Sequence, residues 1–205
     1  MTVMAETSPI REFLLERGAG RLQHPGGTLY AHVSRVAALL VEWGAAEEVQ
    51  IAGLCHACYG TDGYAPVLLS LAERPVLAEL IGPPAESLVY LYASCDRSAL
   101  YPALGAPEPV SFRDRFTGTT STLSERDVRA FLELTVANEL DVIRHSQAMA
   151  AEHGPALHRL FTAARLRLSQ AAWHAWSQQP AHQQEPAEDK PIADSAAAEP
   201  PSSPP

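Results

Sequence analysis

The chain has 205 residues, a formal net charge of −9 and 46% hydrophobic residues, enough apolar material for one domain with a proper core. The acidic balance, without a basic stripe or interleaved aromatic residues, argues against a nucleic-acid polymer as partner. No stretch approaches the length of a membrane span, and the N-terminus lacks a cationic region followed by an apolar one. We therefore expect a cytoplasmic protein with no membrane association.

The first long helix is predicted from Thr28 to Trp43, after a short helix over residues 8–18. Thr28 has the side chain of an N-cap, and Gly44 provides a stop. Apolar residues at steps of three and four form one face: Leu29, Val33, Val36, Leu40 and Trp43. His32 falls on this face, where the pattern demands an apolar residue.

Two later helices repeat this misfit. One is predicted over residues 45–59, up to Gly60, and places His56 on its apolar face beside Ala52 and Cys55. After a short helix over residues 74–82, another opens at Pro83-Pro84, and the carboxylate of Asp96 ends its apolar stripe.

Buried imidazoles and carboxylates need partners, and one divalent metal ion would satisfy His32, His56 and Asp96 together. We therefore predict that their ligand atoms converge within roughly 3 to 5 Å, the span around a common ion. For either histidine alone, a hydrogen bond to a backbone carbonyl is the more frequent explanation.

The segments that carry these residues resemble the metal-dependent HD phosphohydrolase superfamily. They read LYAHVSRVAALLVEWG, IAGLCHACYGTDGY and LVYLYASCDRSALYP, and the similarity covers about residues 10–150. The closer resemblance is to an uncharacterised HD-like branch whose second motif is a histidine followed by Tyr-Gly-Thr. The resemblance implies an all-α helical bundle in which His32, His56 and Asp96 hold metal.

One position departs from the superfamily pattern, because Ala57 stands where the aspartate of the His-Asp pair is expected. The resemblance assigns that aspartate to bridging two metals or orienting water, so a single ion, such as iron or manganese, is the expectation here. Asp62, His24 and Glu139 are candidate replacement ligands, and loss of metal binding is the alternative.

Further candidate site residues flank the predicted helices. His24 and Arg97 are candidate catalytic groups, and Arg97 is also a candidate for holding an anionic substrate. Tyr59, Thr61 and Asp62 follow His56 and are predicted to line the mouth of a pocket. The simpler interpretations are a surface histidine, an arginine that neutralises Asp96 and an ordinary helix stop.

The second half of the chain is predicted to hold a loop and two helices. Residues 98–122, rich in Pro, Gly and Thr, read as a long loop and candidate lid carrying Arg113 and Arg115. A helix from Ser124 is predicted to end at Gly154-Pro155, with Asn138 and Glu139 on an exposed flank or, alternatively, facing the pocket. The last helix would close the core or form a homodimer.

Two regions follow from this pattern: an HD-like helical domain over residues 1–177 and a disordered Pro/Ala/Glu-rich tail over residues 178–205. For function, we favour a metal-dependent enzyme that hydrolyses a phosphoester or related bond in a small anionic metabolite. One alternative is a mononuclear non-haem iron oxygenase at the same triad. The other is a degenerate HD-like module that binds a ligand or partner without catalysis.

Overall fold

The computed structural model describes residues 8–107 and 109–179, and the fold is all-α. The first half contains α2 (Ser8–Glu16), β1 (Gln23–His24), β2 (Gly27–Thr28), α3 (Leu29–Glu42), α4 (Glu47–Cys55), η1 (Leu71–Glu73), α5 (Arg74–Ile81) and α6 (Pro83–Ser94). The second half contains α7 (Arg97–Leu100), η2 (Tyr101–Ala103), β3 (Ser111–Arg113), β4 (Thr120–Thr122), α8 (Glu125–His145), α9 (Gln147–Ala163), η3 (Arg165–Arg167) and α10 (Gln170–Ser177).

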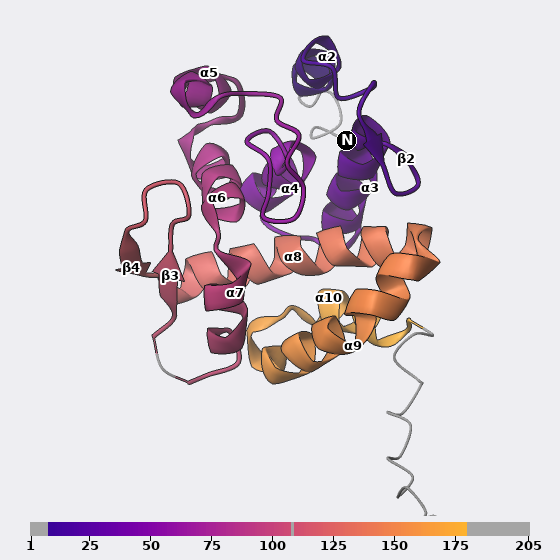
Figure 1. Ribbon diagram of the computed structural model, residues 1–205, viewed down its shortest axis with the longest axis vertical. Helices are drawn as coiled ribbons and strands as arrows, with labels where there is room; N and C mark the ends of the chain where they lie inside the picture. Colours follow the sequence, from indigo (N-terminus) through magenta and orange to yellow (C-terminus); the bar gives the residue numbers. More distant parts are fainter. Residues whose placement is uncertain (1–7, 108, 180–205) are drawn as a thin grey trace, which may run out of the picture.

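Helix α8 organises the bundle, because it packs against elements from both halves of the chain (Figure 1). Helices α3, α4 and α6 contact one side of α8, and α9 and α10 contact it from the other. The core residues of α8 include Phe131, Leu134 and Leu140, which are fully buried. A helix surrounded in this way holds its side chains at fixed positions, which makes it a suitable floor for a site.

The predicted start and stop of α3 are confirmed. The Thr28 hydroxyl accepts a hydrogen bond from the Ala31 N–H at 3.2 Å, as an N-cap does, and Gly44 follows with a φ of 67°. The preceding β1–β2 hairpin turns through Gly26, whose φ is 77°. This tight turn carries His24 to the first turn of α3.

Helix α4 ends earlier than predicted, at Cys55 instead of Tyr59. The Gly53 carbonyl accepts a hydrogen bond from the His56 ring at 2.8 Å, which satisfies a carbonyl at the helix end with a side chain. His56 therefore lies just past the helix, still buried, and the chain after it is free to turn into a loop.

The predicted long loop over residues 98–122 contains the two short helices α7 and η2 and a β-hairpin. In that hairpin Phe112 pairs with Ser121, between two further pairs of residues. The Thr-Gly-Thr-Thr-Ser-Thr run supplies β4, because β-branched threonines suit an extended strand.

The predicted helix end at Gly154-Pro155 is wrong. The break lies at Ser146, whose φ of −147° is extended and whose hydroxyl caps α9 by accepting from the Met149 N–H. The new cap stabilises a change of direction there, while Gly154 is buried and Pro155 lies inside α9. Because of this turn, α9 folds back beside α8 instead of extending it (Figure 1).

The C-terminal part closes the core, with Phe161 and Trp176 packed edge to face at 4.6 Å between ring centroids. Gln179, in the predicted tail, bonds to the Ala175 carbonyl, and the rest of that tail lies outside the described residues. Homodimer formation stays a prediction.

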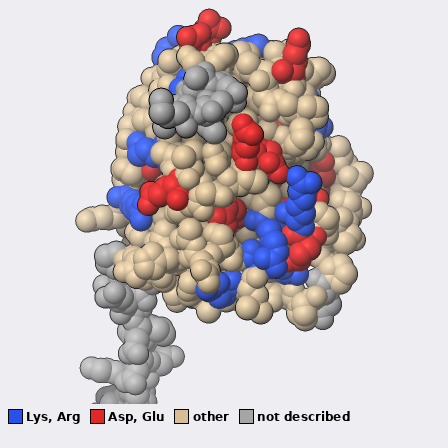
Figure 2. Space-filling view, turned by 180° about the vertical axis from the view of Figure 1, so that it is seen from behind, with Lys and Arg blue, Asp and Glu red and all other residues tan. Residues whose placement is uncertain are grey.

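Two further features of the structure are the lengths of its helices and the distribution of charge on its surface. Over residues 8–107 and 109–179, no helix is both long and apolar enough to cross a membrane. On the face shown in Figure 2, acidic and basic side chains lie among one another, and the basic ones form no continuous stripe.

Candidate functional site

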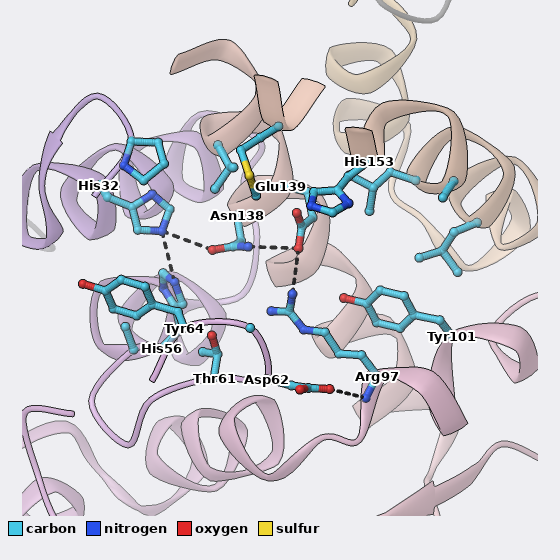
Figure 3. Close-up of a pocket in the computed structure, with 18 of the residues that line it drawn as sticks. His32, His56, Thr61, Asp62, Tyr64, Arg97, Tyr101, Asn138, Glu139 and His153 are labelled. Carbon is cyan, nitrogen blue, oxygen red and sulfur yellow. Dashed lines mark hydrogen bonds and ion pairs between the residues drawn. The ribbon is translucent and has the colours of Figure 1, made fainter. Parts of the chain in front are cut away.

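A pocket of about 720 Å³ lies between the β1–β2 hairpin, the loop after α4, the α7–η2 segment and helices α8 and α9 (Figure 3). Its lining includes the following polar residues: His24, His32, His56, Thr61, Asp62, Tyr64, Arg97, Tyr101, Asn138, Glu139 and His153. The volume is typical of a small-molecule site.

His32 is held in one orientation by Asp141. Its Nδ1 lies 2.7 Å from Oδ2 of Asp141, and both side chains are buried. Burial alone would raise the pKa of Asp141, but hydrogen bonds from His32 and Arg35 outweigh it and lower the pKa to about 2. Because the ionised carboxylate can only accept, the His32 Nδ1 carries the proton and donates.

His56 is fixed in the same tautomer by the backbone. Its Nδ1 donates to the Gly53 carbonyl, and its Nε2 lies 3.3 Å from the Nε2 of His32. Burial, followed by the charge of His32, lowers the pKa of His56 to about 3, so this imidazole is neutral near pH 7. The His56 Nε2 therefore presents a lone pair to His32.

Asn138 brings a third acceptor to the same point. Its Oδ1 lies 3.1 Å from the Nε2 of His32, while its amide nitrogen donates to Glu139 at 3.2 Å. With His32 neutral, three lone pairs would face one another, which is unfavourable unless a cation lies among them. A metal ion among them, or a proton on the Nε2 of His32, would remove this repulsion.

The structure does not bring Asp96 to this point, unlike the prediction from the sequence. The Asp96 carboxylate caps α7, accepting from the Ser98 hydroxyl at 2.7 Å and the Ala99 N–H at 3.2 Å. It does not line the pocket. Because α6 ends at Ser94 and the chain turns, the apolar stripe of α6 does not determine where Asp96 points.

Among the described residues, no group of three or more His, Cys, Asp or Glu side chains is arranged to hold a metal ion. The convergent set is therefore two imidazole nitrogens and the amide oxygen of Asn138. These donor types fit one divalent ion, and Ala57, which lines the pocket, adds no ligand atom.

The other predicted residues divide into two groups. His24, Thr61, Asp62 and Arg97 line the pocket, and the His24 ring stacks on His32 with 3.8 Å between centroids. Burial, with the charge of His32 second, lowers the pKa of His24 to about 4. Tyr59 does not line this pocket, because its hydroxyl donates to buried Glu86 at 3.0 Å.

Arg97 crosses the pocket toward α8 (Figure 3). Its Nη1 lies 3.3 Å from Oε1 of Glu139, and its backbone N–H donates to Asp62 at 3.1 Å. Burial by itself lowers the pKa of Arg97, but Tyr92, Tyr101 and Glu139 outweigh it and raise the pKa above its usual value. Arg97 is therefore a permanent cation inside the pocket, whereas Arg113 and Arg115 of the predicted lid do not line it.

Sequence reasoning missed Asp141 and Tyr101. For Asn138 and Glu139 it favoured an exposed flank over the alternative of facing the pocket, and the structure places both in the pocket lining. Asn138, Glu139 and Asp141, all on α8, are buried. His32 was singled out as a polar residue among apolar ones on a helix. The same pattern applies to Asn138 and Asp141, which are three residues apart on a helix with apolar residues on either side.

Comparison with known proteins adds little to this geometry. A family model described as "Domain of unknown function (DUF6817)" matches residues 13–97, less than half of the chain. The matched segment contains His32 and His56 and ends before α8. Neither a curated protein nor a solved structure matches the chain.

Proposed function

We propose that this protein is a metal-dependent, HD-like enzyme that acts on a small anionic metabolite, with hydrolysis of a phosphoester or related bond as the reaction. In this proposal His32, His56 and Asn138 hold one divalent ion. The observation that carries it is the approach of the two Nε2 atoms to 3.3 Å while both Nδ1 atoms donate elsewhere.

A divalent ion at this position would supply a water molecule of lowered pKa as nucleophile. The protein's own groups orient what surrounds it. Asp141 and the Gly53 carbonyl fix the two imidazoles, and Glu139 accepts from both Asn138 and Arg97. Arg97 provides positive charge for an anionic substrate, and His24 stacks against His32 at the pocket wall.

A binding module without catalysis is the second candidate, and a specific observation favours it. Ala57 and Asn138 leave the set without a carboxylate, and a proton on His32 would satisfy the same acceptors as a metal. The oxidative alternative relied on Asp96 as the carboxylate of a facial triad, and Asp96 lies outside the pocket.

Titration calorimetry of chelator-treated protein with Mn²⁺ and Zn²⁺ tests the metal proposal. We expect one ion per chain in the natural protein and none in His56→Ala, because the substitution removes a ligand nitrogen. His174→Ala is the control, since His174 is exposed on α10. Binding that persists in His56→Ala contradicts the site.

Hydrolysis of phosphate monoesters and diesters, with and without the bound ion, then separates the enzyme from the module. Turnover that depends on the ion and is lost in His56→Ala supports the enzyme. Metal binding without turnover of any phosphoester would favour the module.

A further inference from the structure

One wall of the pocket is an apolar face of α9. The residues on this face recur at alternating steps of four and three, which is one stripe of a helix: Met149, His153, Ala156, Leu160 and Ala163. Four of these five are apolar, and Leu157 and Arg159 of α9 also line the pocket. The pocket that this stripe lines is also lined by Arg97 of α7 and by Asn138 and Glu139 of α8.

This stripe adjoins the face with which α9 packs on the core. Phe161 is buried in the core, and Leu157 is buried and also lines the pocket, whereas Ala156 is exposed and Leu160 is only partly covered. Alanine at 156 and 163 leaves space that a larger side chain would fill. The protein thus keeps an apolar surface next to an open volume, which is typical of a small-molecule site.

The α7–η2 side of the pocket carries hydrogen-bond donors. Tyr101 is partly buried, and its hydroxyl oxygen is inaccessible and has no hydrogen-bond partner within the described ranges. Burial raises the pKa of Tyr101 well above its usual value, so the hydroxyl keeps its proton and can donate. Figure 3 shows this hydroxyl directed toward Arg97.

Arg97 has capacity for a further anionic partner. Its contacts with Glu139 and with the Tyr92 hydroxyl are both 3.3 Å, long for hydrogen bonds of a charged group. A carboxylate or phosphate of a ligand could therefore bind Arg97, and a small rotation of the Tyr101 side chain would bring its hydroxyl to the same anion. Glu139 and Asn138 connect Arg97 to His32 through successive hydrogen bonds, so that end of the ligand lies on the histidine side.

We infer that the pocket binds an amphipathic acid, with a carboxylate or phosphate at Arg97 and Tyr101 and an apolar body along the α9 stripe. The inference rests on the proposed function only in taking this pocket as the substrate site. The volume of about 720 Å³ exceeds what an inorganic anion needs and suits a ligand with a sizeable apolar part.

Calorimetry on the full chain in excess EDTA tests this class of ligand without any metal. The probes are octyl phosphate, octanoate, octan-1-ol and inorganic phosphate. We expect the better of the two amphipathic anions to bind at least tenfold tighter than octan-1-ol or inorganic phosphate. The order of octyl phosphate and octanoate tells which head group is preferred. Equal binding of octan-1-ol, or of inorganic phosphate, overturns the inference.

Two substitutions place the ligand. Tyr101→Phe removes a hydroxyl that has no hydrogen-bond partner among residues 8–107 and 109–179, so it should weaken the anionic probe about tenfold, leave octan-1-ol unchanged and preserve the melting temperature. Ala156→Trp should fill the apolar end and weaken both amphipathic anions at least tenfold. Ala151→Trp is the matched control, because Ala151 is exposed on α9 and does not line the pocket.

Unchanged affinity in both Tyr101→Phe and Ala156→Trp would show that the probe binds elsewhere and overturn the inference. The metal proposal fails or survives separately. If the amphipathic anions bind as expected but calorimetry finds no divalent ion, the inference stands without the metal site. If the ion binds and the amphipathic anions do not, the metal site stands and the inference is overturned.

Discussion

The Asp141 carboxylate accepts the Nδ1 proton of His32 at 2.7 Å, although 109 positions separate the two residues. The same carboxylate accepts from Arg35 at 2.6 and 2.9 Å, one turn along α3 from His32. Asp141 thereby joins α8 to α3 and decides which nitrogen of His32 faces the pocket. A histidine ligand with a carboxylate behind it is the usual arrangement at metal sites.

Asp141→Asn should weaken divalent-metal binding by about tenfold to a hundredfold, because the amide no longer fixes the His32 tautomer. Calorimetric titration of metal-free protein measures this. Asp127→Asn is the control, since Asp127 lies on the exposed first turn of the same helix. An Asp141→Asn protein that binds metal as tightly as the natural protein would contradict a ligand role for His32.

Ala57→Asp should raise divalent-metal affinity, by about tenfold or more, because it adds a carboxylate oxygen where the present set has none. Ala57 lines the pocket directly after His56, so the new side chain begins close to the ligands. Ala57→Asn, of the same shape but without charge, is the matched comparison. Equal affinities for the Asp and Asn variants would argue against a cation at this point.

The metal-free protein should lose stability as the pH falls below about 6.5. The pKa of His56 is lowered to about 3 in the folded state, so between these values the unfolded chain binds a proton that the folded chain does not. This histidine contributes about 1.4 kcal/mol per pH unit to the slope. Its contribution is fully retained above pH 6.5.

Urea unfolding in EDTA at pH 7.5, 6 and 5 measures this slope. His56→Ala should reduce it, whatever the variant's stability at pH 7.5. His24 contributes in the same direction, because its pKa is lowered to about 4, so the slope should not vanish. An unchanged slope in His56→Ala would mean that His56 titrates normally.

Glu86, on α6, forms a buried ion pair that is independent of the pocket. Its carboxylate accepts from Arg74 at 2.7 and 3.0 Å and from Tyr59, and its side chain is only 6% exposed. Arg74→Met should lower the free energy of unfolding by about 3 kcal/mol, because the charge of Glu86 is left buried without its partner.

The ion pair of Arg17 and Glu73, in which both side chains are about one third exposed, provides the control for that substitution. Its side chains are 33% and 34% exposed, so water screens the pair and Arg17→Met should cost clearly less stability than Arg74→Met. Urea unfolding of both variants makes the comparison. Equal losses in the free energy of unfolding would show that burial of Glu86 does not increase the cost of removing its partner.

The sequence alone determined the all-α class, the inward direction of His32 and His56 and the ends of α3. These features depend on local chemistry, namely the 3.6-residue period, an N-cap threonine and a glycine stop, which neighbouring residues express wherever the helix lies. Two helix ends were missed for different reasons. The end of α4 depends on the His56 ring bonding the Gly53 carbonyl, a side-chain contact that a helical period does not register. The break at Ser146 depends on how α9 packs.

Only the tertiary structure decided which residues join the histidines. The sequence placed Asp96 with them because it ends an apolar stripe, yet the chain turns there and Asp96 caps α7. Asn138 and Asp141 reach His32 because α8 crosses α3, a contact between segments over 100 positions apart. A helical period gives the face of a residue but not the helix that covers that face, so long-range partners could not be read from one sequence.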